Sequence, residues 1–129
     1  MIKVFVKKQG NYPVNARKVK EKVKDVLRKG GIVSDAEVSV FFTGEKKIIE
    51  LAKRYLKEKK PIHSVLSFSE TGGSEKFPYP PDNVIRLGEI VICYPKMVGE
   101  ATKEGKLIEE KVMELVEHGA LHLLGIHHE

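Results

Sequence analysis

The sequence predicts an α+β fold, in which a small mixed β-sheet is packed with helices. Short segments of alternating hydrophobicity are interleaved along the chain with longer segments of helical periodicity. The chain has 129 residues, which suits one hydrophobic core. Hydrophobic residues make up 41% and charged residues 32%, a balance that excludes a disordered chain. We therefore expect a single domain over residues 1–129.

The first element is predicted to be a strand over residues 1–7, because apolar and polar side chains alternate there. Asn15 is placed to cap the helix that follows. The apolar positions of that helix keep helical spacing until the glycine pair at 30–31 stops it; they are Val19, Val23, Val26 and Leu27.

The next elements are a strand over 37–42, where apolar side chains alternate again, and a second helix capped by Thr43. This helix ends before Pro61, since proline disfavours helix in the residue before it. Its inner side is apolar and its outer side is rich in lysine and arginine. A short strand is expected over 64–68.

The second half of the chain begins with a long connecting segment, 69–86, that is rich in glycine and proline. Residues 87–94 are the most apolar strand candidate and are expected to be central in the sheet or to line a cleft. A short helix is predicted over 96–105. A longer one follows over 106–124, where apolar side chains recur at helical spacing.

Charge divides the chain into two halves. Residues 1–60 hold 17 Lys and Arg against 7 Asp and Glu, whereas residues 61–129 hold 6 against 11. A basic half of this strength suits a polyanion such as RNA, because clustered cations release the counterions of the phosphates. The alternative is a set of solvated helix faces.

The chain shows no signal peptide and no apolar run long enough to span a bilayer. Cys93 is the only cysteine, so it forms no internal disulfide, and its apolar strand suggests a small core residue. We therefore expect a cytoplasmic protein without a membrane partner. Its oligomeric state is left open.

Four of the five histidines fall in the last twelve residues. His118 and His122 are four positions apart, which places both on one face of a helix, about 5.4 Å apart and within reach of one metal ion. Gly125 can adopt the left-handed conformation that ends a helix, which would bring His128 back as a third ligand. Three neutral imidazoles leave a coordination position open for water, whose pKa falls toward roughly 7 on a divalent cation.

The sequence therefore predicts one Zn²⁺ per chain, bound by His118, His122 and His128 at the C-terminal end of the last long helix, and a hydrolytic reaction. The alternative is that these histidines bind no metal. The frame H-x-x-x-H-x-x-G-x-x-H resembles that of metzincin peptidases, which need a glutamate general base directly after the first histidine. Gly119 stands there, which argues against peptidase chemistry.

Residues 118–128 resemble the signature H-G-x-L-H-L-x-G-x-D-H of the YbeY family of rRNA maturation endoribonucleases. Segments 65–68 (VLSF) and 88–90 (GEI) match two further family segments in the expected order. The resemblance covers the chain from about Phe41 onward. It implies a small α+β sandwich, a catalytic zinc on the three histidines, and cleavage of single-stranded RNA. The implied roles are maturation of the 3′ end of small-subunit rRNA and ribosome quality control, with rRNA and the small ribosomal subunit as partners.

The chain departs from the family pattern at several positions. His127 stands where the family has aspartate, which puts in doubt a carboxylate that would orient a ligand. The family arginine that precedes the VLSF segment corresponds to Leu56 or Lys57. Lys57 can keep a positive charge for a phosphate, though without the two-pronged geometry of guanidinium. His63 is a candidate substrate contact or general acid, or else a polar residue at a strand entry.

We predict a zinc-dependent endoribonuclease in which zinc-bound water attacks the scissile phosphate, with Lys57 and His63 as candidate catalytic residues. One alternative is a non-catalytic ribosome assembly or RNA-binding factor with a structural zinc. Another is a zinc hydrolase that acts on a small molecule or peptide. Ser67 is expected to bond to backbone, and Glu89 is either an outward-facing strand carboxylate or a cleft residue.

Overall fold

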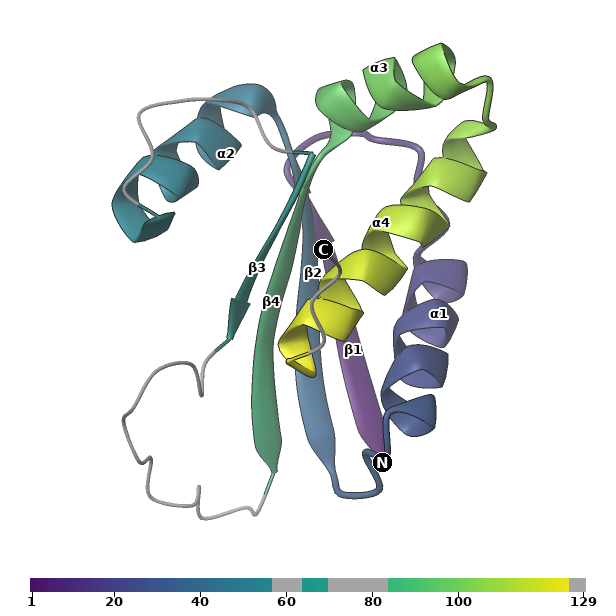
Figure 1. Ribbon diagram of the computed structural model, residues 1–129, viewed down its shortest axis with the longest axis vertical. Helices are drawn as coiled ribbons and strands as arrows, with labels where there is room; N and C mark the ends of the chain where they lie inside the picture. Colours follow the sequence, from purple (N-terminus) through teal and green to yellow (C-terminus); the bar gives the residue numbers. More distant parts are fainter. Residues whose placement is uncertain (57–63, 70–83, 126–129) are drawn as a thin grey trace.

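A computed structural model of the protein describes residues 1–56, 64–69 and 84–125. Its sheet, within these residues, has four strands in the order β1-β2-β4-β3 (Figure 1). The strands are β1 (Ile2–Lys8), β2 (Ala36–Thr43), β3 (Val65–Ser69) and β4 (Ile85–Cys93). β1, β2 and β4 are parallel, and β3 is antiparallel to β4. The predicted mixed sheet is confirmed, and β4 has the central place expected for residues 87–94.

The helices lie on both faces of the sheet (Figure 1). They are α1 (Ala16–Lys29), α2 (Glu45–Leu51), α3 (Tyr94–Glu104) and α4 (Ile108–Leu123), and a π-helical turn, η1 (Ala52–Leu56), extends α2. α1 and α4 pack side by side over one face, and α2 with η1 packs against the other. None of the described helices has the length and the apolar content needed to cross a membrane.

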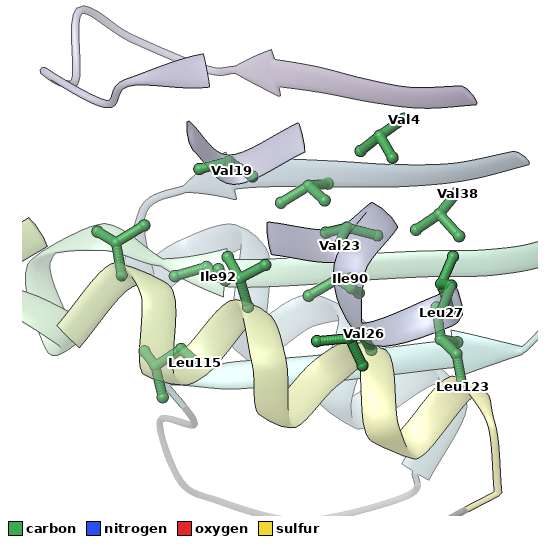
Figure 2. Packing of buried hydrophobic residues seen from close by; sticks show 14 of the residues in the cluster. Val4, Val19, Val23, Val26, Leu27, Val38, Ile90, Ile92, Leu115 and Leu123 are labelled. Atoms are coloured by element: carbon green, nitrogen blue, oxygen red, sulfur yellow. The ribbon is translucent and has the colours of Figure 1, made fainter. Parts of the chain in front are cut away.

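The main core lies between the sheet and the α1–α4 layer. Alternate residues of each strand point into it, since successive side chains of a strand lie on opposite faces. Figure 2 shows how the α1 side chains Val23 and Leu27 and the α4 side chain Leu123 meet Val38 and Ile90 of the sheet. This layer fixes α4 on β4, which positions the histidines of α4.

A smaller core lies on the opposite face, where Ile48 and Ala52 pack against Leu66, Val91 and Cys93. Cys93 is fully buried, which confirms its prediction as a core residue. Burial raises the pKa of its thiol, because the thiolate would lose its hydration. Cys93 therefore supplies packing to this face.

Several predicted boundaries hold and others change. Asn15 caps α1 as expected, and its side-chain oxygen accepts from the Lys18 N–H at 3.1 Å. Thr43 does not cap α2. It is the last residue of β2, where its hydroxyl donates to the Gln9 side chain, and Gly44 precedes the helix instead. The hydroxyl thus goes to a partner distant in sequence, which no local pattern reveals.

Two elements begin two residues earlier than predicted. α3 starts at Tyr94 and not at residue 96, because Pro95 fits the first helical turn, where its missing N–H has no bond to make. β4 starts at Ile85 and not at residue 87, because the Ile85 N–H donates to the Asp35 carbonyl at 2.9 Å. The predicted connecting segment 69–86 therefore loses its last two residues to the sheet. Residues 70–83 lie outside the described part of the chain.

A buried lysine connects α3 to α4. Lys111 of α4 is only 4% exposed, and its ammonium donates to both carboxylate oxygens of Glu104 at 3.0 Å and to Glu114 at 2.8 Å. These hydrogen bonds hold the pKa of Glu104 below its ordinary value, and bonds from Lys106 and Lys111 do the same for the pKa of Glu114. The N-terminal half of α4 is thereby fixed to α3.

We expect Lys111→Met to destabilise the fold by about 1–2 kcal/mol at pH 7, because it removes the charged donor and keeps the apolar stem. The ordinary pKa of Glu104 and Glu114 is 4.5, and their folded pKa values are lower. The stability that these two carboxylates contribute is thus complete above about pH 4.5, and it is lost as the pH falls through their pKa values in the folded protein. The difference in the free energy of unfolding between wild type and variant, measured by urea unfolding, should become smaller as the pH is lowered from 5 to 3. A difference that persisted at pH 3 would assign the effect to packing alone.

Candidate metal centre

Two of the predicted ligands face one another on α4. The ring centroids of His118 and His122 are 4.3 Å apart, and the ring planes are tilted by 45°. The four-residue spacing therefore brings the imidazoles together as the helical periodicity predicts. Zinc binds imidazole nitrogen at about 2.0–2.1 Å, so two ligand nitrogens of a tetrahedral site lie about 3.3 Å apart. Two rings at this separation suit that requirement.

Gly119 sets how closely α4 approaches the sheet at this point. A Cβ built on Gly119 would lie 2.6 Å from Cγ2 of Ile90 on β4 and 3.1 Å from Oγ of Ser67 on β3. Real Cβ atoms essentially never approach another atom as closely as 2.6 Å. Ile90 is fully buried and branched at Cβ, so it has little freedom to move aside. Only glycine fits this contact without a shift.

A hydrogen bond supports the same contact. The Ser67 hydroxyl donates to the Gly119 carbonyl at 3.1 Å, which confirms the prediction that Ser67 bonds to backbone. The carbonyl belongs to α4 and not to the strand of Ser67 itself. This bond ties β3 to the helix between its two histidines.

The position after His118 has a steric role that the sequence did not reveal. In the peptidase frame a glutamate stands there, and here that position faces the sheet at a distance where no side chain fits. A glutamate general base is absent at this position because the packing of α4 on the sheet leaves no room for its side chain. The one signal in the sequence is the pair of small residues, Gly119 and Ala120, between the two histidines.

α4 ends as predicted. Gly125 has φ +83°, the left-handed conformation, and its N–H donates to the His122 carbonyl at 2.9 Å. Leu124 lies against the end of α1, because a Cβ on Gly30 would be 2.5 Å from Leu124 Cδ1. The C-terminal ends of α1 and α4 therefore meet at Leu124, just after the last turn of α4.

The other predicted site residues lie outside the described part of the chain. They are Lys57, His63, His127 and His128. Among residues 1–56, 64–69 and 84–125, no three His, Cys, Asp or Glu side chains lie close enough to hold a metal ion. The described part thus supplies two ligands, His118 and His122, and the third stays a prediction.

Donor chemistry supports the fit of a metal to this pair. Imidazole nitrogens suit Zn²⁺ and other first-row divalent ions. Nε2 of His122 is shielded from solvent. Glu89 is half-buried and lies on the sheet face opposite α4, since its neighbour Ile90 is the residue that α4 contacts. Glu89 is therefore an outward strand carboxylate and not part of this centre.

Comparisons with known proteins agree with this architecture. The family model described as Endoribonuclease YbeY matches residues 5–129. A relative named Endoribonuclease YbeY from Dehalococcoides mccartyi is 32% identical over an alignment of 136 residues, which covers 99% of this chain and 84% of the relative. The protein of the same name from Roseiflexus castenholzii is 34% identical, over an alignment that covers 90% of this chain and 72% of the relative.

A solved structure is also similar. The solution structure of TM1509 from Thermotoga maritima matches with a TM-score of 0.59 and 27% sequence identity, over 98% of this chain and 75% of that one. The match of the family model over residues 5–129 and the sequence identities of 32–34% over nearly the whole chain establish the family. This protein belongs to the YbeY endoribonuclease family.

Proposed function

We propose that this protein is a zinc-dependent endoribonuclease that cuts single-stranded RNA in the maturation of the 3′ end of small-subunit rRNA and in ribosome quality control. Family membership supports the reaction class and the RNA substrate. The observation that carries the site is the His118–His122 pair on α4, with ring centroids 4.3 Å apart. We assign residues 1–129 to one metal-hydrolase-like domain.

In this proposal the chain holds one Zn²⁺ through His118, His122 and His128. When bound, the ion supplies a Lewis acid that activates water near neutral pH and offsets charge that develops on a phosphate. The chain itself holds two ligand imidazoles rigidly, because Gly119 seats α4 on β4 and Ser67 bonds to the same turn. A rigid ligand pair lowers the cost of ordering the site when the metal binds.

Lys57 and His63 are proposed to act on the RNA. Lys57 would attract the phosphate through its charge, and His63 would contact the substrate or supply a proton to the leaving oxygen. Both residues precede β3, the strand whose Ser67 bonds to α4. Their assignment rests on the family resemblance of this stretch of sequence and on the chemistry of the two side chains.

The test is cleavage of a labelled RNA that carries the 3′ end of precursor small-subunit rRNA, with zinc and other divalent ions added to metal-free protein. We expect metal-dependent cuts in the single-stranded part of the substrate. Turnover on ester or peptide substrates in place of RNA would favour the zinc hydrolase of small molecules. One bound metal and RNA binding without any turnover would favour the ribosome assembly factor with a structural zinc.

A further inference from the structure

We propose that Ser67 is a positioning residue of the candidate metal centre, and that its hydrogen bond couples strand β3 to a metal ion held by His118 and His122. The inference rests on the proposed function, because it concerns the same two ligands. It goes further by giving a role to a strand that supplies none of the predicted ligands. In this role Ser67 acts through the backbone of α4 and contacts neither the metal nor the RNA.

The histidine pair lies on the flank of α4 that faces β3. The opposite flank faces α1, because Glu117 lies 3.6 Å from Lys22 of that helix. At about 100° per residue, His118 and His122 project roughly 100° and roughly 140° around the helix from Glu117. α1 packs beside β1, at one edge of the sheet, and α4 packs on β4 and on β3, at the other edge (Figure 1). The flank of α4 away from α1 is therefore the flank toward β3.

The turn of α4 that carries the two histidines needs support from outside the helix. It lies close to the end of α4 at Leu123, and helix ends fray. It also contains Gly119, and glycine is the weakest helix former after proline. The relative position of the two imidazoles therefore depends on contacts that hold this turn against the sheet.

Ser67 and Ile90 form the seat for this turn. The two residues are directly opposite one another in the antiparallel pairing of β3 with β4, and both lie beside Gly119. Ile90 limits how closely the helix approaches, and the Ser67 hydroxyl donates to the Gly119 carbonyl at 3.1 Å. A hydrogen bond has a preferred direction, which an apolar contact lacks. The Ser67 bond therefore fixes the rotation of the turn on the sheet as well as its distance.

Packing alone does not explain a serine at this position. Side chains of a strand alternate between the two faces, and the neighbouring inward residues, Val65 and Ile90, are apolar and belong to the main core. The outward residues Leu66 and Phe68 already anchor β3 in the smaller core. An apolar side chain at position 67 would bury more apolar surface, whereas the hydroxyl bonds to the turn between the two ligands. The choice of serine thus fits a positioning role.

The coupling must act in both directions. If β3 holds the ligand turn in place and so favours metal binding, metal binding stabilises β3 by the same free energy. β3 is one edge of the four-stranded sheet that the structure describes, and β1 is the other. β1 lies on the side of the sheet away from the histidine pair. It therefore provides an internal comparison for the effect of the metal on β3.

The first test is the affinity for zinc. Ser67→Ala removes the hydroxyl alone. The matched control is Ser39→Ala, which changes another half-buried strand serine whose side chain points away from α4, since its neighbours Val38 and Val40 pack in the main core. We expect zinc to bind Ser67→Ala about tenfold more weakly, at the lower end of the range for a group that supports a ligand, and Ser39→Ala as it binds the wild type. Dissociation constants are measured by competition with a chelator, at a temperature where thermal unfolding shows all three proteins to be folded. Lower stability by itself then leaves the constant unchanged.

The second test is amide hydrogen exchange in β3 and β1, with and without zinc. We expect zinc to slow exchange in β3 more than in β1 in the wild type, because global stabilisation affects both strands and the coupling affects β3 alone. In Ser67→Ala this difference between the strands should disappear. If Ser67→Ala does not fold, the comparison of the two strands in the wild type decides.

Four outcomes separate this inference from the proposed function. Zinc binding by Ser67→Ala at the wild-type affinity, or equal weakening by Ser67→Ala and Ser39→Ala, would overturn the inference. Equal slowing of exchange in β3 and β1 of the wild type would also overturn it. Each of these results leaves the proposed function standing. A wild type that binds no zinc would overturn both.

Discussion

Replacement of His122 by alanine is expected to abolish zinc binding and to lower RNA cleavage by more than a hundredfold. Loss of a group that merely supports a metal ligand costs about 10–100-fold in affinity or activity, so loss of a ligand itself should cost more. The ring of His122 is paired with that of His118 at 4.3 Å, and no other described His, Cys, Asp or Glu joins them. His118→Ala should therefore have the same effect.

The measurements are zinc titration by calorimetry and cleavage of the labelled rRNA precursor, each on freshly prepared metal-free protein. Thermal unfolding of metal-free wild type and variant serves as the fold control, and we expect a difference of only a few degrees, because His122 is partly exposed. Cleavage by His122→Ala at the wild-type rate would show that the activity comes from a contaminant or another site. Zinc binding at full affinity would remove His122 from the ligand set.

Replacement of Gly119 by alanine is expected to destabilise the fold by about 1–2 kcal/mol and to weaken zinc binding. Alanine in place of glycine usually stabilises a helix interior by about 1 kcal/mol. Here the added Cβ would lie 2.6 Å from Ile90 Cγ2, and overpacking of this kind costs about 1–3 kcal/mol. The helix must move away from β4, which displaces both histidines. A loss of stability in Gly119→Ala, in place of the gain usual for a helical glycine, would thus be direct evidence of the contact with Ile90.

Gly99 in α3 provides the matched control. It is an exposed helical glycine, and a Cβ built on it meets nothing within 4 Å. Gly99→Ala should therefore stabilise the protein by up to about 1 kcal/mol, whereas Gly119→Ala destabilises it. Urea unfolding of both variants gives the comparison. Equal stabilisation by the two substitutions would mean that α4 does not sit as close to β4 as the structure has it.

A double-mutant cycle with Ile90→Ala isolates the contact. Ile90→Ala alone should cost about 2–5 kcal/mol, because it empties a fully buried site. It also removes both Ile90 atoms that a Cβ at position 119 would meet. Gly119→Ala should then cost less in the Ile90→Ala background than in the wild type, with a coupling of about 1 kcal/mol or more. Strict additivity would contradict the direct clash.

Much of the fold follows from local pattern. The alternation over 1–7 and 37–42 predicted β1 and β2, and Asn15 predicted the start of α1, since these signals depend on neighbours in sequence. Thr43 failed as a cap because its hydroxyl bonds to Gln9, 34 residues away. The start of β4 was misplaced because its first hydrogen bond goes to Asp35. Partners so distant in sequence leave no periodic signal.

The sequence by itself determined the family, the pairing of His118 with His122 on one helix face and the left-handed end of α4 at Gly125, because each depends on residue types at fixed helical spacing. Only the tertiary structure decided why glycine follows His118, which side chains of α1 form ion pairs with α4, and that the ends of the two helices meet at Gly30 and Leu124. Each of these depends on a contact between elements far apart in the chain. Such contacts are fixed by how side chains fill the space between packed layers, which no spacing along one element encodes.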